Sequence, residues 1–145
     1  MTADEALTIA VLDASVALAW VLPGERSAQA MRLRDLAVRD GHRLLCPPIF
    51  WYEIANALWV ASRRDRLSTD GAHQALAALR DFTMESCDAD PAACLSLATQ
   101  CRLAVSDAAY LVISLDRQVP LWSFDQGLVS AASQLGITVH PSAEL

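Results

Sequence analysis

Two acids in this sequence stand where short apolar runs end. The run TIAVL closes on Asp13, with Ser15 two residues later, and Asp125 follows the run VPLWSF. Continuous apolar runs of this length are typical of strands that are buried on both faces of a parallel sheet. Ligand sites in such sheets form beyond the carboxyl ends of the strands. We therefore expect Asp13 and Asp125 to converge on one edge of a sheet, although each could also serve only as a helix cap.

Two further acids, Glu53 and Asp107, lie in segments that are otherwise apolar. Glu53 belongs to PPIFWYEIANALWV, where Asn56 follows three residues later on the same helix face, and Asp107 belongs to LAVSDAAYLVISL. An ionised carboxylate in an apolar setting is costly unless it is paired or bound to a metal, and neither segment contains Lys or Arg. Hard oxygen ligands suit Mg²⁺ or Mn²⁺. The acids together predict a divalent metal site, whereas Asp107 alone could simply favour a helix start.

The elements that would position these acids alternate between strands and helices. We expect strands at residues 8–13, 42–46, 83–87, 119–123 and 137–140. We expect helices at residues 14–22, 25–40, 49–62, 68–81, 91–102, 106–118 and 126–135, with Ser68 and Ser106 as caps. This alternation predicts an α/β fold, a three-layer α/β/α sandwich with a central, mostly parallel sheet, formed by a single domain over residues 1–145.

Charge and cysteine content narrow the functional class. The formal net charge is −6, which is unusual for a protein that holds nucleic acid by bulk attraction. All eleven basic residues are Arg, and Arg63, Arg64 and Arg66 cluster where they could contact phosphate or form a solvated helix end. The four cysteines lack zinc-ligand spacing, so we interpret them as reduced core residues: Cys46, Cys87, Cys94 and Cys101.

No apolar run reaches the length of a membrane span. The start MTADEALT carries acids where a secretory signal would carry positive charge, which predicts a cytoplasmic protein.

Four segments together resemble the acidic motifs of PIN-domain nucleases, and within them the VapC-type toxins of bacterial toxin–antitoxin pairs. These are VLDASVALAW, WYEIANAL, VSDAAYLVISL and LWSFDQGLV, which follow in the family's order across nearly the whole chain. The resemblance implies that one or two Mg²⁺ or Mn²⁺ ions are bound by four acids: Asp13, Glu53, Asp107 and Asp125. It also implies that Ser15 and Ser123 line the acidic cluster, with Ser123 standing where many members have Thr. Asn56 matches a polar position that is often near the site.

The same resemblance implies an activity and partners. The expected activity is cleavage of RNA phosphodiester bonds, with tRNA or ribosomal RNA as the usual targets. The expected assembly is a homodimer, or a higher toxin–antitoxin assembly, with a small antitoxin whose tail lies in a groove between residues 17–22 and 51–60. Most of the large apolar side chains are interpreted as core, and some as interface: Trp20, Leu22, Trp51, Trp59 and Trp122.

Two other classes of protein remain as alternatives. A phosphatase-like α/β domain also opens with a strand that ends in Asp, but such domains usually have a second Asp at the position of Ser15 and a Lys near the phosphate. This chain has no Lys and no GxxxxGK loop. The other alternative is a PIN-like fold that serves only as a binding module.

Overall fold

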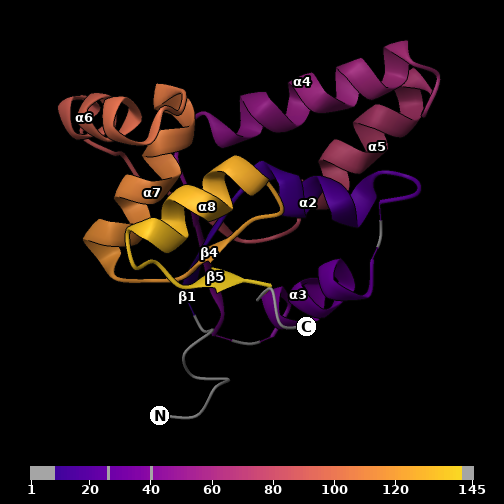
Figure 1. Ribbon diagram of the computed structural model, residues 1–145. Helices are drawn as coiled ribbons and strands as arrows, with labels where there is room; N and C mark the ends of the chain where they lie inside the picture. Colours follow the sequence, from indigo (N-terminus) through magenta and orange to yellow (C-terminus); the bar gives the residue numbers. More distant parts are fainter. Residues whose placement is uncertain (1–8, 26, 40, 142–145) are drawn as a thin grey trace.

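The computed structural model describes residues 9–25, 27–39 and 41–141, which form one five-stranded sheet between layers of helices (Figure 1). The strand order is β3-β2-β1-β4-β5, and every neighbouring pair is parallel. The strands are β1 (Ile9–Leu12), β2 (Arg43–Cys46), β3 (Met84–Ser86), β4 (Leu121–Trp122) and β5 (Val139–His140). The predicted three-layer α/β/α fold is therefore confirmed, with a sheet that is wholly parallel across the described strands.

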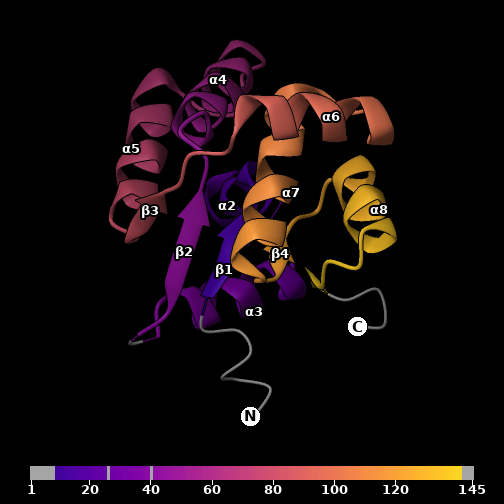
Figure 2. The same cartoon turned by 90° about the vertical axis from the view of Figure 1, so that its left-hand side faces the viewer.

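Helices cover both faces of this sheet. They are α2 (Ala14–Val21), α3 (Ala28–Ala37), α4 (Phe50–Arg63), α5 (Thr69–Arg80), α6 (Pro91–Cys101), α7 (Val105–Arg117) and α8 (Gln126–Gln134). Figure 2 shows α7 across the near face of the sheet, with α2 and α3 behind it. Right-handed crossovers explain this division, because the chain moves outward in one direction from β1 to β3 and in the other from β4 to β5.

The central strand β1 is buried from both sides. Ala10, Val11 and Leu12 are at most 1 % exposed, which explains why the sequence shows a continuous apolar run there and no alternation. Trp122 of β4 and Trp20 of α2 are also buried, whereas Trp59 on α4 is exposed and Trp51 is half-buried. Most of the large apolar side chains are therefore in the core or partly buried, and the expectation that some lie at an interface stays a prediction.

Capping residues decide where several helices begin. Ser27 Oγ accepts a hydrogen bond from Ala30 N at 3.0 Å, so α3 begins three residues later than the predicted start at Glu25. Ser68 caps α5 as predicted, through Gly71 N at 2.9 Å. The prediction that Ser106 caps α7 was wrong, because the N-cap residue is Ala104 and Ser106 lies inside the first turn. Two predicted element ends, residues 8 and 40, lie outside the described residues.

The order of the strands reverses next to β1. The chain proceeds from β1 to β2 on one side, while β4 and β5 lie on the other, which makes the carboxyl ends of β1 and β4 a topological switch point. The two strand ends are joined by a backbone hydrogen bond, in which Asp13 N donates to Trp122 O at 3.0 Å. The fold therefore brings Asp13 beside Ser123 and Asp125, as the sequence predicts.

Two further expectations can be compared with the structure. The four cysteines are free, with Cys101 half-buried and the other three buried. Among the described residues, no helix has both the length and the apolar character needed to cross a bilayer.

Candidate active site at the carboxyl ends of β1 and β4

Asp13 is the most buried acid of the site and accepts hydrogen bonds from two side-chain hydroxyls. Its side chain follows β1 and is 7 % exposed. The hydroxyls of Ser15 and Ser123 both donate to Asp13 Oδ2, at 2.6 Å and 2.9 Å. Both hydroxyls thus hold the same carboxylate oxygen, and the backbone N–H of Ser15 also lies close enough to the carboxylate to lower its pKa.

The backbone that follows β4 orients both serine hydroxyls. Phe124 N donates to Ser15 Oγ at 3.0 Å, and Asp125 N donates to Ser123 Oγ at 3.0 Å. Each hydroxyl thus accepts from an amide with its oxygen and directs its proton toward Asp13. The two serines that the family resemblance indicates therefore lie beside the carboxylate and fix its orientation.

Asp125 combines a structural contact with a position at the rim of the site. It is the N-cap residue of α8, and its Oδ1 accepts from Leu128 N at 3.0 Å. The side chain is exposed. The cap uses one carboxylate oxygen, so the cap role and a ligand role are compatible.

Glu53 and Asp107 come from the first turns of α4 and α7. Glu53 is half-buried, and its Oε1 accepts a hydrogen bond from the hydroxyl of Tyr110 at 2.7 Å. Asp107 is half-buried and makes no hydrogen bond with the described residues, although its place at a helix N-terminus favours a negative charge. Asn56 is exposed on α4 and also has no hydrogen-bond partner among them.

Tyr110 was missed by the sequence analysis. It lies three residues after Asp107, on the same face of α7, and its side chain is fully buried. The sequence does show a tyrosine one helical turn after the candidate ligand Asp107. It does not show that the hydroxyl binds Glu53, which is 57 residues away in the chain.

Burial and mutual repulsion raise the pKa of three of these acids. For Asp13 the largest influence is burial, which raises the pKa, and the negative charge of Asp125 raises it further. Hydrogen bonds from Ser15 and Ser123 lower the pKa and oppose this shift. Burial also raises the pKa of Glu53, with additions from Asp13 and Asp107, while the bond from Tyr110 opposes the shift.

The pKa of Asp107 rises for the same reasons, through burial first and then through the charges of Asp125 and Asp13. Within the described part of the chain, no arginine forms an ion pair with any of the four acids. The carboxylates therefore lie close enough to repel one another, and their negative charge is not neutralised by protein.

The chemistry of this donor set fits a hard divalent cation, because four carboxylates from four different elements converge with no basic partner. As the side chains stand, however, no group of three or more His, Cys, Asp or Glu residues in the described ranges is arranged to hold an ion. The donor types agree with the predicted magnesium or manganese site, but the described side chains would have to move closer together to hold an ion.

A groove leads away from the acids between α2 and α4. Its volume is 660 Å³, and its walls include Leu18 and Leu22 on one side and Val60 and Arg64 on the other. Ser15 and Phe124 line the groove and also belong to the hydrogen-bond network around Asp13, so the groove opens beside the acids. It lies where a groove was expected along residues 17–22, but it uses the C-terminal half of α4 and not the turn around Trp51.

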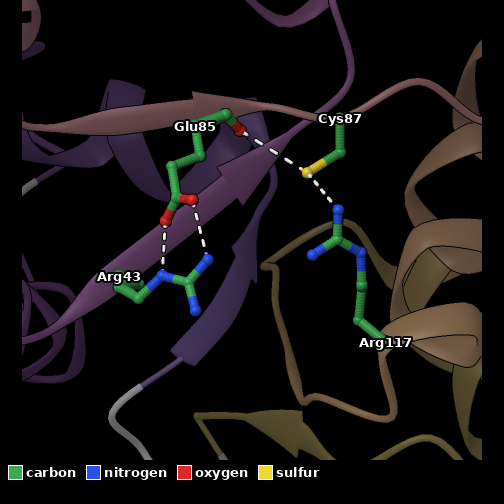
Figure 3. Close-up of polar contacts among 4 residues, drawn as sticks. All are labelled: Arg43, Glu85, Cys87 and Arg117. Carbon is green, nitrogen blue, oxygen red and sulfur yellow. Dashed lines mark hydrogen bonds and ion pairs between the residues drawn. The ribbon is translucent and has the colours of Figure 1, made fainter.

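Several arginines have protein partners, among them Arg66 of the predicted Arg cluster. Arg66 donates to Pro23 O at 3.1 Å, and its guanidinium Nη2 lies 3.5 Å from Glu25 Oε1 in an ion pair. Figure 3 shows Arg43 making two hydrogen bonds of 2.7 Å to Glu85, and Arg117 donating to Cys87 Sγ at 3.6 Å.

Arg63 lies over the ring of Trp59, 4.8 Å from its centroid. Arg64 lines the groove, and its side chain makes no hydrogen bond or ion pair with the described residues. Arg64 is thus the member of the predicted Arg cluster that is best placed to contact a ligand.

Comparisons with known proteins agree with this fold and this site. The family profile of the PIN domain matches residues 10–133. Ribonuclease VapC3 of Pyrobaculum aerophilum is 34 % identical over 122 residues, which are 75 % of this chain and 90 % of VapC3. The chain therefore belongs to the PIN domain family, as a member of the VapC type, which confirms the resemblance drawn from its four acidic motifs.

Two solved structures share the fold at lower sequence identity. The crystal structure of PAE2754 from Pyrobaculum aerophilum has a TM-score of 0.67 and 21 % identity, covering 92 % of this chain and 84 % of that one. The structure of VapC20 from Mycobacterium tuberculosis, described as a sarcin–ricin loop cleaving toxin, has a TM-score of 0.59 and 18 % identity. It covers 84 % of this chain and 94 % of VapC20.

Proposed function

We propose that this chain is a Mg²⁺- or Mn²⁺-dependent endoribonuclease and the toxin of a toxin–antitoxin pair. The observation that carries the proposal is the convergence of four acids from four elements at the switch point of a PIN-type sheet. Asp13, Glu53, Asp107 and Asp125 would hold the cation. The chemistry that a bound cation supplies here is neutralisation of charge at the scissile phosphate and a lowered pKa for a nearby water.

The remaining work falls to the chain's own side chains. Ser15 and Ser123 hold Asp13 Oδ2 in place, so that the carboxylate is already oriented before a ligand binds. Glu53 Oε2 has no hydrogen-bond donor among the described residues and can orient an attacking water or accept its proton. Burial raises the pKa of Glu53, which brings this carboxylate closer to the range where a general base works near neutral pH.

RNA is the proposed substrate because the groove and a free arginine adjoin the acids. Arg64 would contact a phosphate along the groove, while Arg66 instead fixes the loop after α2. Both of the VapC proteins in the comparison are described as RNA-cleaving, VapC3 as a ribonuclease and VapC20 as a cleaving toxin of the sarcin–ricin loop. These descriptions support RNA as the substrate class, and tRNA or ribosomal RNA is the target that we propose.

An antitoxin and a second copy of the chain are the proposed partners. The groove between α2 and α4 is apolar along Leu18, Leu22 and Val60, and it suits the apolar tail of an antitoxin. A homodimer would cover exposed apolar side chains such as Leu95 on α6. Light scattering on the isolated chain tests the dimer, which the change Leu95→Asp should weaken and Leu103→Met should not.

The test of the proposed activity is cleavage of total RNA by the purified chain. Wild type with millimolar Mn²⁺ should release defined RNA ends, and both EDTA and the change Asp13→Asn should abolish them. Mapping those ends identifies the target. If wild type cleaves no RNA with its antitoxin absent, the chain is better explained as a PIN-like binding module.

The arginine assignment has its own measurement. Loss of one phosphate contact reduces the slope of log affinity against log salt concentration by about 1. We expect that reduction for Arg64→Ala on the RNA substrate, with an unchanged slope for Arg102→Ala, an exposed C-cap residue of α6 that does not line the groove. An unchanged slope for Arg64→Ala would remove this residue from the RNA contact.

A further inference from the structure

We infer that Tyr110 is a positioning residue of the acid site: its hydroxyl fixes Glu53 Oε1 and leaves Oε2 as the oxygen available to a cation or water. This inference rests on the proposed function, because it assigns a role toward the same cation. It concerns a residue that carries no charge and that the four acidic positions do not include.

The contact between Tyr110 and Glu53 is short, partly buried and isolated. The hydroxyl lies 2.7 Å from Oε1, and the tyrosine side chain is 0 % exposed. Among the hydrogen bonds of the described residues, it alone joins α4 to α7. The orientation of Glu53 relative to α7 therefore depends on this one hydroxyl.

The tyrosine ring is a rigid support for that hydroxyl. A fully buried ring has its two side-chain torsions fixed by packing, so the donor is in place before a ligand arrives. Phenylalanine would fill the same volume in the core. The oxygen of Tyr110 thus serves Glu53 and not the packing of the core, although any buried tyrosine hydroxyl needs some acceptor.

A second observation points to positioning. Asp13 and Glu53, here called the inner acids, follow the same pattern, because side-chain hydroxyls of the described residues hold one carboxylate oxygen of each. Asp107 and Asp125, the outer acids, accept no hydrogen bond from a described side chain. Helix α7 carries both Asp107 and, one turn later, the hydroxyl that holds Glu53, so one helix sets the placement of two acids.

The variant Tyr110→Phe removes only the hydroxyl. We expect Mn²⁺ affinity, measured by calorimetry in the absence of RNA, to fall by about 10- to 100-fold, the usual loss when a group that orients a metal ligand is removed. We also expect kcat for RNA cleavage to fall with little change in KM. The matched control is Tyr52→Phe, next to Glu53 in the chain, because that tyrosine is 75 % exposed and its hydroxyl has no partner among the described residues.

A double-variant cycle separates positioning from general stability. If Tyr110 acts through Glu53, then Tyr110→Phe should weaken Mn²⁺ binding no further in a Glu53→Gln background. An equal loss in both backgrounds would mean that Tyr110 acts on the fold as a whole, and would overturn the inference. The melting temperature of each variant shows that the comparison is made between folded proteins.

The outcomes also distinguish this inference from the function on which it rests. If wild type binds Mn²⁺ and cleaves RNA while Tyr110→Phe equals it in both, the inference is wrong and the proposed function stands. If wild type neither binds Mn²⁺ nor cleaves RNA, both are wrong. A crystal structure of Tyr110→Phe in which Glu53 keeps its orientation would likewise contradict positioning.

Discussion

The inner and outer acids of the site differ in how the fold holds them. The inner acids, Asp13 and Glu53, are bonded by hydroxyls from three other positions, and Asp13 is almost wholly buried. The outer acids, Asp107 and Asp125, accept no hydrogen bond from a described side chain, and Asp125 is exposed. The inner half of the site is therefore preorganised by the protein, whereas the outer half can adjust when a ligand brings the four carboxylates together.

The largest expected effect is the loss of RNA cleavage when the inner acid Asp13 is replaced. Asp13→Asn should lower RNA cleavage by more than about 100-fold, since a direct ligand matters more than the groups that orient it. Its melting temperature should not fall, because the amide oxygen can still accept from Ser15 and Ser123 and a buried charge is removed.

The matched outer variant is Asp125→Asn, which keeps an N-cap for α8 because Asn caps as well as Asp does. We expect a smaller loss of cleavage from this change than from Asp13→Asn, with an equally intact fold. Equal losses, measured as initial rates on the same RNA, would show that the division into inner and outer acids has no functional meaning.

The next effect concerns the hydroxyl network that makes the inner half rigid. Ser123→Ala removes a donor to Asp13 Oδ2 and leaves Asp125 N without its acceptor. We expect cleavage to fall by about 10- to 100-fold and the free energy of unfolding to fall by about 1–3 kcal/mol. Ser130→Ala on the exposed face of α8 is the control. If both serine variants behave alike in rate and in urea unfolding, the network does not orient Asp13.

The sequence predicted the positions of the acids better than their partners. Asp13 and Asp125 could be placed together because strand ends in a parallel sheet share one edge, and that argument needs only the hydrophobic pattern. The ends of helices were less predictable, since Ser27 caps α3 and Ser106 does not cap α7. A serine near a helix start is a candidate cap, but the backbone angles decide which residue takes that role.

The hydroxyl partners of the inner acids could not be derived from pattern alone. Ser123 and Asp13 are 110 residues apart, and Tyr110 and Glu53 are 57 apart. Each pair depends on how two elements cross in three dimensions, which local periodicity does not encode. The same limit applies to Arg66, a candidate phosphate contact in the sequence that in the structure donates to Pro23 O in the loop after α2.

A smaller effect should follow from adding a cation to the folded protein. Binding to the native state stabilises it by about 2.7 kcal/mol when the ligand is at 100 times its dissociation constant. Millimolar Mn²⁺ should therefore raise the melting temperature of wild type and have little effect on Asp13→Asn. An unchanged melting temperature for wild type would contradict a cation site formed by these acids.

The smallest effect is a pH dependence of the metal-free protein. Burial raises the pKa of Asp13, Glu53 and Asp107 above their ordinary values of 3.8 for Asp and 4.5 for Glu. Between the unfolded and the folded pKa, the native state binds more protons than the unfolded chain does. The free energy of unfolding contributed by these acids is therefore fully present below the unfolded pKa and falls as pH rises through that window.

Comparison with Asp13→Asn isolates this contribution from that of other carboxylates, such as Glu85, whose pKa is lowered by its bond to Arg43. Melting temperatures measured in EDTA from about pH 4 upward should show wild type losing stability relative to Asp13→Asn as pH rises. The loss should stop once pH exceeds the folded pKa of Asp13. A difference in melting temperature that stays constant with pH, or that grows in favour of wild type, would contradict this prediction. It would mean that the hydrogen bonds to Asp13 fully offset the cost of burying its ionised carboxylate.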